Sequence, residues 1–141
     1  MKLSLSTFVL VFIFFNTNNL FANTNFFNDG LVFYEKKEYD KAKFKFEQDI
    51  VYNPKSEKSY LYLSKIFHEQ EKFDEEKKNL NTVILLNPKN EEATFNLVKL
   101  KLKESDFSGS KKLVEQLLSF CDKFCVKGRK LKVDIENSLK K

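Results

Sequence analysis

The sequence of 141 residues has few of the residues that form turns, metal sites or disulfide frameworks: three glycines, two prolines, two cysteines, one histidine and no tryptophan. So little glycine and proline leaves too few turn residues for a many-stranded β fold, and favours long helices with short connections. His68 is the single histidine, and we find no Ser-His-Asp set and no glycine-rich phosphate loop. The composition predicts an all-α protein that is not an enzyme and holds no metal or cofactor.

Phenylalanine and charged residues are abundant instead: 16 Phe, and 25 basic against 20 acidic residues. The basic residues are interleaved with acidic ones, as in residues 35–38 and 69–78. This mixture is typical of solvated helix faces and not of a phosphate-binding stripe. We therefore expect no nucleic-acid partner.

The first 22 residues have the features of a secretory signal peptide. Lys2 precedes an unbroken apolar run over residues 8–15, and Ala22 is a small residue at a plausible cleavage point. The run is shorter than the roughly 20 apolar residues that cross a bilayer. We expect residues 1–22 to be removed and the mature chain to be periplasmic or secreted, without stable membrane insertion. A membrane anchor and a buried segment of the fold are the alternatives.

A 34-residue period organises the rest of the chain. Asn53-Pro54 recurs as Asn87-Pro88, and a proline after a helical pattern ends the helix. A consistent register over three windows predicts three copies of one supersecondary unit. The same spacing relates three further sets: Tyr39, Phe73 and Phe107; Gly30, Ser64 and Val98; and Phe46, Leu80 and Val114.

This pattern resembles the tetratricopeptide repeat, in which an aromatic residue is followed at fixed places by Leu-Gly, Tyr, Ala, Phe and Pro. The second window departs at Glu76, where a small residue is usual, and the third window is degenerate. The resemblance implies an all-α, TPR-like α-solenoid of three helical hairpins, with windows at residues 23–56, 57–90 and 91–124 of a repeat region 23–126. The first window holds Phe26, Gly30, Phe33, Ala42, Phe46 and Pro54 at the places of the pattern.

The chain after the third window predicts one more helix. Leu131, Ile135 and Leu139 recur every four residues in an otherwise charged segment. A stack of hairpins leaves its last apolar face open, and a helix with a polar outer side covers such a face. We interpret residues 127–141 as a capping helix, with a frayed tail as the alternative.

Cys121 and Cys125 lie where the third window ends. An even number of cysteines in an exported chain favours a disulfide. Side chains four apart in a continuous helix suit a bridge poorly, so bonding requires the helix to end near Cys121. We favour a structural disulfide that closes the turn before the cap. A free pair and a redox or metal role are the alternatives.

The resemblance also implies a binding site, because tetratricopeptide repeats line a concave groove with a second stripe of their first helices. Here Phe27, Leu61 and Phe95 would form an apolar strip beside Lys65 and Lys99. In the alternative, Phe27 and Leu31 pack on a neighbouring helix or on a second copy. One subclass of the tetratricopeptide family binds the terminal carboxylate of its partner with lysines and asparagines. Of the positions that this subclass uses, only Asn96 has such a residue here. The implied groove residues are Phe27, Leu31, Tyr34, Leu61, Lys65, His68, Phe95, Lys99 and Leu102.

These observations favour a non-catalytic, exported scaffold that binds a protein or peptide segment through its groove. Two other functions stay open at this point. One is a thiol-dependent or metal-linked periplasmic factor that uses Cys121 and Cys125. The other is a structural homo-oligomer whose groove is filled by its own copy.

Overall fold

The computed structural model describes residues 25–140 and places within them seven helices and no strand. This confirms the all-α fold of three hairpins followed by a C-terminal helix. The segment predicted to be a signal peptide lies outside the described residues. The helices are α2 (Phe26–Glu35), α3 (Tyr39–Tyr52), α4 (Glu57–Glu69), α5 (Phe73–Leu86), α6 (Glu91–Lys103), α7 (Phe107–Phe120) and α8 (Cys125–Ser138).

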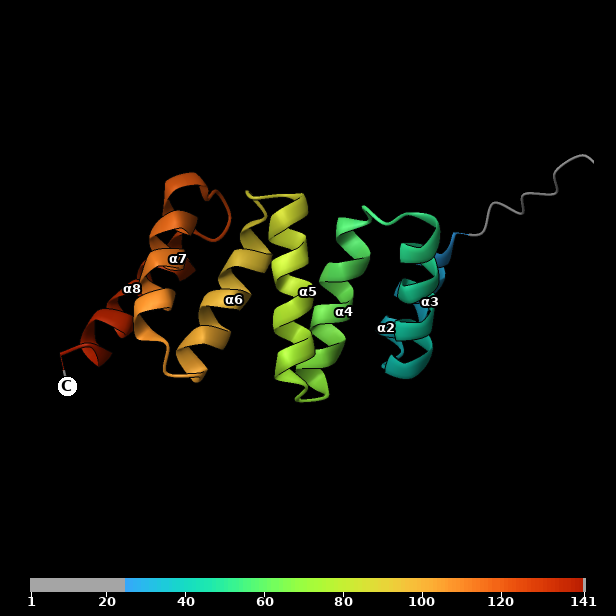
Figure 1. Ribbon diagram of the computed structural model, residues 1–141, viewed down its shortest axis with the longest axis horizontal. Coiled ribbons are helices and arrows are strands. Elements are labelled where there is room, and N and C mark those ends of the chain that lie inside the picture. The colour runs from blue at the N-terminus through green and yellow to red at the C-terminus, as the bar shows by residue number, and fades with distance from the viewer. Residues whose placement is uncertain (1–24, 141) are drawn as a thin grey trace, which may run out of the picture.

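Successive helices pair and stack in a row, with the first hairpin at one end and α8 at the other (Figure 1). Helix α2 packs on α3, α4 on α5, and α6 on α7, and each hairpin then contacts the next. Helix α8 packs on α7 at the end of the row. No helix within residues 25–140 has the length and apolar character needed to cross a bilayer.

The residues that the 34-residue register relates to Gly30 are buried in all three hairpins. Gly30 is buried, and a Cβ atom built on it would lie 2.6 Å from Cε1 of Phe46. The ring of Phe46 therefore occupies the space that a side chain at residue 30 would need. The equivalent places in the next two hairpins, Ser64 and Val98, are also buried. Fully buried side chains recur likewise at Phe46, Leu80 and Val114.

The three hairpin turns repeat one backbone conformation. Lys37, Glu71 and Ser105 have positive φ angles of 59°, 56° and 60°, and they are spaced by the same 34 residues. In each turn this residue donates its N–H to a carbonyl three residues earlier, and the next residue donates to a carbonyl five residues earlier. This is the Schellman pattern that ends helices in the left-handed region. Here it is formed without glycine.

The C-terminal end has a different closure. Helix α7 ends at Phe120, the chain extends at Cys121, and a disulfide joins Cys121 to Cys125 with 5.3 Å between their Cα atoms. The carboxylate of Glu91 accepts hydrogen bonds from the backbone N–H groups of Asp122 (2.9 Å) and Phe124 (2.8 Å). These donors lower the pKa of the Glu91 carboxyl, with the Phe124 bond as the main cause.

Helix α8 begins at Cys125, two residues before the predicted segment 127–141, because the disulfide loop returns the chain to a helical path at that point. Ile135 is fully buried against Val98 and Val114, and Leu131 packs beside it. Leu139, the third residue of the predicted stripe, lies beyond the helix and is 49% exposed. The C-terminal helix thus covers the last hairpin with two of its three predicted apolar residues.

Candidate functional site

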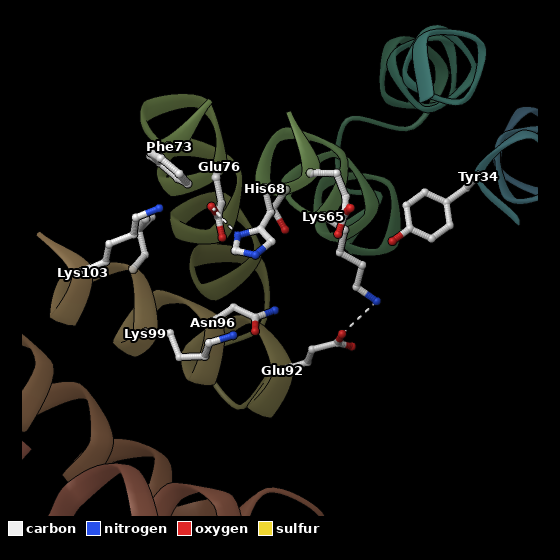
Figure 2. A pocket seen from close by; sticks show the side chains of 12 residues that line it. Tyr34, Lys65, His68, Phe73, Glu76, Glu92, Asn96, Lys99 and Lys103 are labelled. Carbon is white, nitrogen blue, oxygen red and sulfur yellow. Dashed lines mark hydrogen bonds and ion pairs between the residues drawn. The ribbon is translucent and has the colours of Figure 1, made fainter. Parts of the chain in front are cut away.

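A hollow of about 520 Å³ opens between α4, α5 and α6, with Tyr34 of α2 at one side (Figure 2). Nine of the twelve residues that line it have polar or charged side chains. The other three are Phe73, Leu100 and Tyr34. The remaining lining residues are Ser64, Lys65, His68, Glu69, Glu76, Glu92, Asn96, Lys99 and Lys103.

A buried carboxylate lies at the centre of the hollow. Nδ1 of His68 and Oε2 of Glu76 are 3.0 Å apart, and Figure 2 shows the pair between the lysines of α4 and α6. The Glu76 side chain is only 5% exposed, whereas the His68 side chain is 53% exposed. A buried carboxylate needs a hydrogen-bond partner. His68 provides one and places its imidazole at the surface of the hollow.

Of the three lysines that line the hollow, one forms an ion pair with a described residue and two do not. Nζ of Lys65 lies 2.8 Å from a carboxylate oxygen of Glu92, so this charge is compensated across two hairpins. Lys99 and Lys103 form no ion pair with any described residue. Nζ of Lys103 lies 3.5 Å from the centroid of the Phe73 ring. The uncompensated positive charge of the hollow therefore belongs to α6, on the helix face that also carries Asn96.

Four of the nine predicted groove residues line this hollow: Tyr34, Lys65, His68 and Lys99. They come from three helices, α2, α4 and α6, as a groove formed by the first helices requires. Partial burial raises the pKa of the Tyr34 phenol. Its ring packs edge-on against Tyr62, with centroids 5.1 Å apart, which fixes this wall of the hollow.

The predicted apolar strip of Phe27, Leu61 and Phe95 does not line the hollow. Leu61 is 9% exposed and belongs to the core of the second hairpin. The Phe27 ring packs on Phe46 and Tyr62, with centroid distances of 5.7 and 5.8 Å. Phe27 and Leu61 thus serve the packing between hairpins and not a ligand-facing strip.

The other predicted groove residues also pack within the protein. Phe95 packs on Phe124 of the disulfide loop, with centroids 5.2 Å apart. Leu31 packs against the core cluster that contains Phe46, and Leu102 packs against the cluster of Val98, Val114 and Ile135. The alternative in which Phe27 and Leu31 contact a neighbouring helix is the arrangement that the structure has.

Several lining residues were absent from the predicted set, and some carried a signal. Lys103 lies one turn after Lys99 on the same helix, so its position on the same face followed from the helical period. Glu76 stood out as a carboxylate at a small-residue place. Phe73 carried no such signal, because the repeat pattern related it only to the other residues of the 34-residue spacing.

Comparison with known proteins identifies the fold. No protein-family model matches the chain, and no curated protein sequence matches it. The first TPR domain of Spaghetti (RPAP3), bound to the HSP90 peptide SRMEEVD, is similar with a TM-score of 0.74 and 15% identity over 82% of this chain and 91% of that domain. The Yersinia enterocolitica chaperone SycD, in complex with a peptide of the translocator YopD, is similar with a TM-score of 0.76 and 11% identity over 87% and 98% of the two chains. The chain has a tetratricopeptide-repeat fold.

Within the tetratricopeptide-repeat fold, Glu76 marks the second repeat as different from the other two. Ala42 and Ser110 occupy the equivalent places in the first and third repeats, and both are fully buried. A carboxylate can replace these small side chains because His68, on the paired helix, lies within hydrogen-bond distance of it. Glu76 thus gives the second repeat a polar contact with the His68 imidazole at a place that Ala42 and Ser110 occupy in the other two repeats.

Proposed function

We propose that the protein is a non-catalytic scaffold that binds an extended segment of another protein in the hollow between α4 and α6. The observation that carries this proposal is the pair of uncompensated lysines, Lys99 and Lys103, beside Asn96 and the Phe73 ring. Positively charged hydrogen-bond donors next to an aromatic ring fit a peptide segment that has an acidic group and a neighbouring apolar side chain.

The similar structures support a peptide ligand. The RPAP3 domain is bound to a peptide of HSP90, and SycD is in complex with a peptide of a translocator. The acidic group in our proposal contacts Lys99 and Lys103, and not Lys65. Glu92 already compensates Lys65, so that lysine positions Glu92 and does not attract a ligand carboxylate.

The test begins with a displayed library of random peptides, from which binders of the protein are selected. The selected peptides are then made with each Asp or Glu replaced by its amide. We expect the amide peptides to bind more weakly, with a dissociation constant that depends less on salt, because exposed charge pairs act mainly through encounter rate and screening.

The variant Lys99→Gln/Lys103→Gln should flatten the salt dependence for the acidic peptide to the level of the amide peptide. Lys72→Gln/Lys78→Gln, which removes two exposed lysines outside the hollow, is the matched control and should leave the salt dependence unchanged. Equal behaviour of the two double variants would contradict the proposal. Phe95→Ala should lower stability through lost contact with Phe124 but keep the affinity.

Export is part of the proposal and rests on the apolar run that ends before Ala22. We propose that the mature chain begins at Asn23 and is periplasmic or secreted. Mass measurement of the protein from its native host tests this start directly. A form that begins with Met1 and sediments with membranes would show an anchor in place of a cleaved signal, and would leave the binding proposal to be judged by the peptide experiment.

A further inference from the structure

The net charge of the folded chain is confined to its C-terminal end. Residues 25–120 hold 17 basic and 17 acidic residues, whereas residues 121–141 hold seven basic and three acidic ones. The repeats are therefore neutral as a whole. The disulfide loop, α8 and the last residues carry a net charge of +4, which includes Arg129, the single arginine of the chain.

The outer face of α8 combines this charge with exposed aliphatic side chains. Val126 is 73% exposed and Val133 is 54% exposed, and they lie two helical turns apart on one face. Arg129 and Lys130 are exposed between them, and Lys127 is exposed at one edge. None of these three basic residues forms an ion pair with a described residue. Lys132, by contrast, faces Glu115 and Glu136.

Helix α8 lies at the end of the row of hairpins, and within residues 25–140 no helix follows it there (Figure 1). The opposite side of α8 is occupied, since Ile135 is buried and Gly128 packs near Leu117 and Leu118. The hollow is lined by residues of α2, α4, α5 and α6 and by none of α8. The two surfaces therefore share no residue.

We propose that the outer face of α8 docks on an anionic lipid bilayer. Basic residues on a helix attract anionic headgroups, and small apolar side chains between them enter the headgroup boundary. Lys127, Arg129 and Lys130 form no ion pair with a described residue, and their positions in the sequence place them at different angles around the axis of α8. This spread fits a diffuse negative surface better than a fixed set of carboxylates on a protein. The interaction is peripheral and salt-sensitive, and it is independent of the ligand in the hollow.

Vesicle co-sedimentation tests the proposal with the chain from Asn23 on, which contains all the described helices. Vesicles of phosphatidylethanolamine with about one-third phosphatidylglycerol should bind the protein, and vesicles of phosphatidylcholine should not. Each removed basic group should weaken binding about fivefold, so Lys127→Gln/Arg129→Gln/Lys130→Gln should weaken it roughly a hundredfold. Circular dichroism verifies that this variant keeps its helices.

A matched triple variant removes the same charge from exposed lysines in the repeats: Lys36→Gln/Lys55→Gln/Lys89→Gln. It should retain binding within a few-fold, whereas Val126→Ser/Val133→Ser should lose several-fold affinity at unchanged net charge. Equal loss in the two triple variants would reduce the effect to net charge and overturn the proposal. So would binding to soluble polyglutamate with no binding to anionic vesicles, because the face would then fit an acidic protein.

Discussion

The two ends of the repeat stack have cores of different chemistry. The core at the first hairpin is aromatic: Phe46 is fully buried and contacts Phe27 and Tyr62. The core between the third hairpin and α8 consists of three aliphatic residues, Val98, Val114 and Ile135. At this end of the stack a disulfide and the hydrogen bonds of the Glu91 carboxylate add to the contacts of the smaller core. One repeat pattern thus tolerates either a large interlocking ring or a smaller core supplemented by covalent and polar contacts.

The largest effect should come from truncation of the aromatic core. Phe46→Ala should lower the free energy of unfolding by about 3–5 kcal/mol, because the lost ring leaves a cavity between two hairpins. Its equivalent at the other end, Val114→Ala, should cost about 1–3 kcal/mol, since it removes less buried volume. Urea denaturation measures both values. Equal losses would mean that the two cores contribute alike.

The two buried glycines sharpen the comparison. In Gly30→Ala the new Cβ would lie 2.6 Å from a Phe46 ring that cannot move away, and overpacking should cost about 1–3 kcal/mol. In Gly128→Ala the nearest atom is Cδ2 of Leu118 at 3.1 Å, the end of a flexible side chain. The helix propensity of alanine should then offset the contact to within about 1 kcal/mol. Thermal unfolding of both variants tests this, and a larger loss at Gly128 would reverse the order of the two ends.

Removal of the disulfide should affect only the C-terminal end. Cys121→Ser/Cys125→Ser should destabilise the protein by about 1–2 kcal/mol, because the closed loop is short. Chemical denaturation with and without a reductant measures the effect, and the reductant should not change the double variant. If both thiols of the natural protein react with an alkylating agent before reduction, the bond is absent and this prediction is wrong.

The smallest effect should appear in the dependence of stability on pH. The pKa of Glu91 is lowered in the folded state, so its contribution is fully present above the unfolded pKa of about 4.3 and is lost as the pH falls through the folded value. Glu91→Gln should therefore lose stability at neutral pH and show a shallower decline on acidification. Glu75→Gln, an exposed carboxylate on α5, is the control. Parallel acid titrations of the two variants would show that the Glu91 contacts contribute nothing.

The sequence predicted what depends on position within one repeat. Gly30, Ser64 and Val98 were related to one another by the 34-residue spacing, and all three are buried. The same spacing related Phe46, Leu80 and Val114, which are all fully buried. Such positions are decided by helical period and by the proximity of two helices joined by a short turn, both of which are local properties of the chain.

The hollow was only partly predictable, because its lining depends on the angle between hairpins. Lys65 reaches Glu92 across the boundary between the second and third repeats, and Lys99 and Lys103 remain the uncompensated lysines of the hollow. Phe95 packs on Phe124 and does not line the hollow. Phe124 belongs to the disulfide loop, which the repeat pattern does not describe. The position of Glu76 was evident from the sequence, but its hydrogen bond to His68 was not.

The left-handed residue of each hairpin turn has a consequence for how such a chain can grow. Lys37, Glu71 and Ser105 close their hairpins with the same backbone geometry although their side chains share no chemistry. Residues other than glycine pay a steric penalty in that region, so glycine at any of the three should be tolerated or stabilising. Duplication of a 34-residue stretch would then insert a complete module whose joints already match those on either side. Only the module that precedes the disulfide loop would need to keep its own sequence.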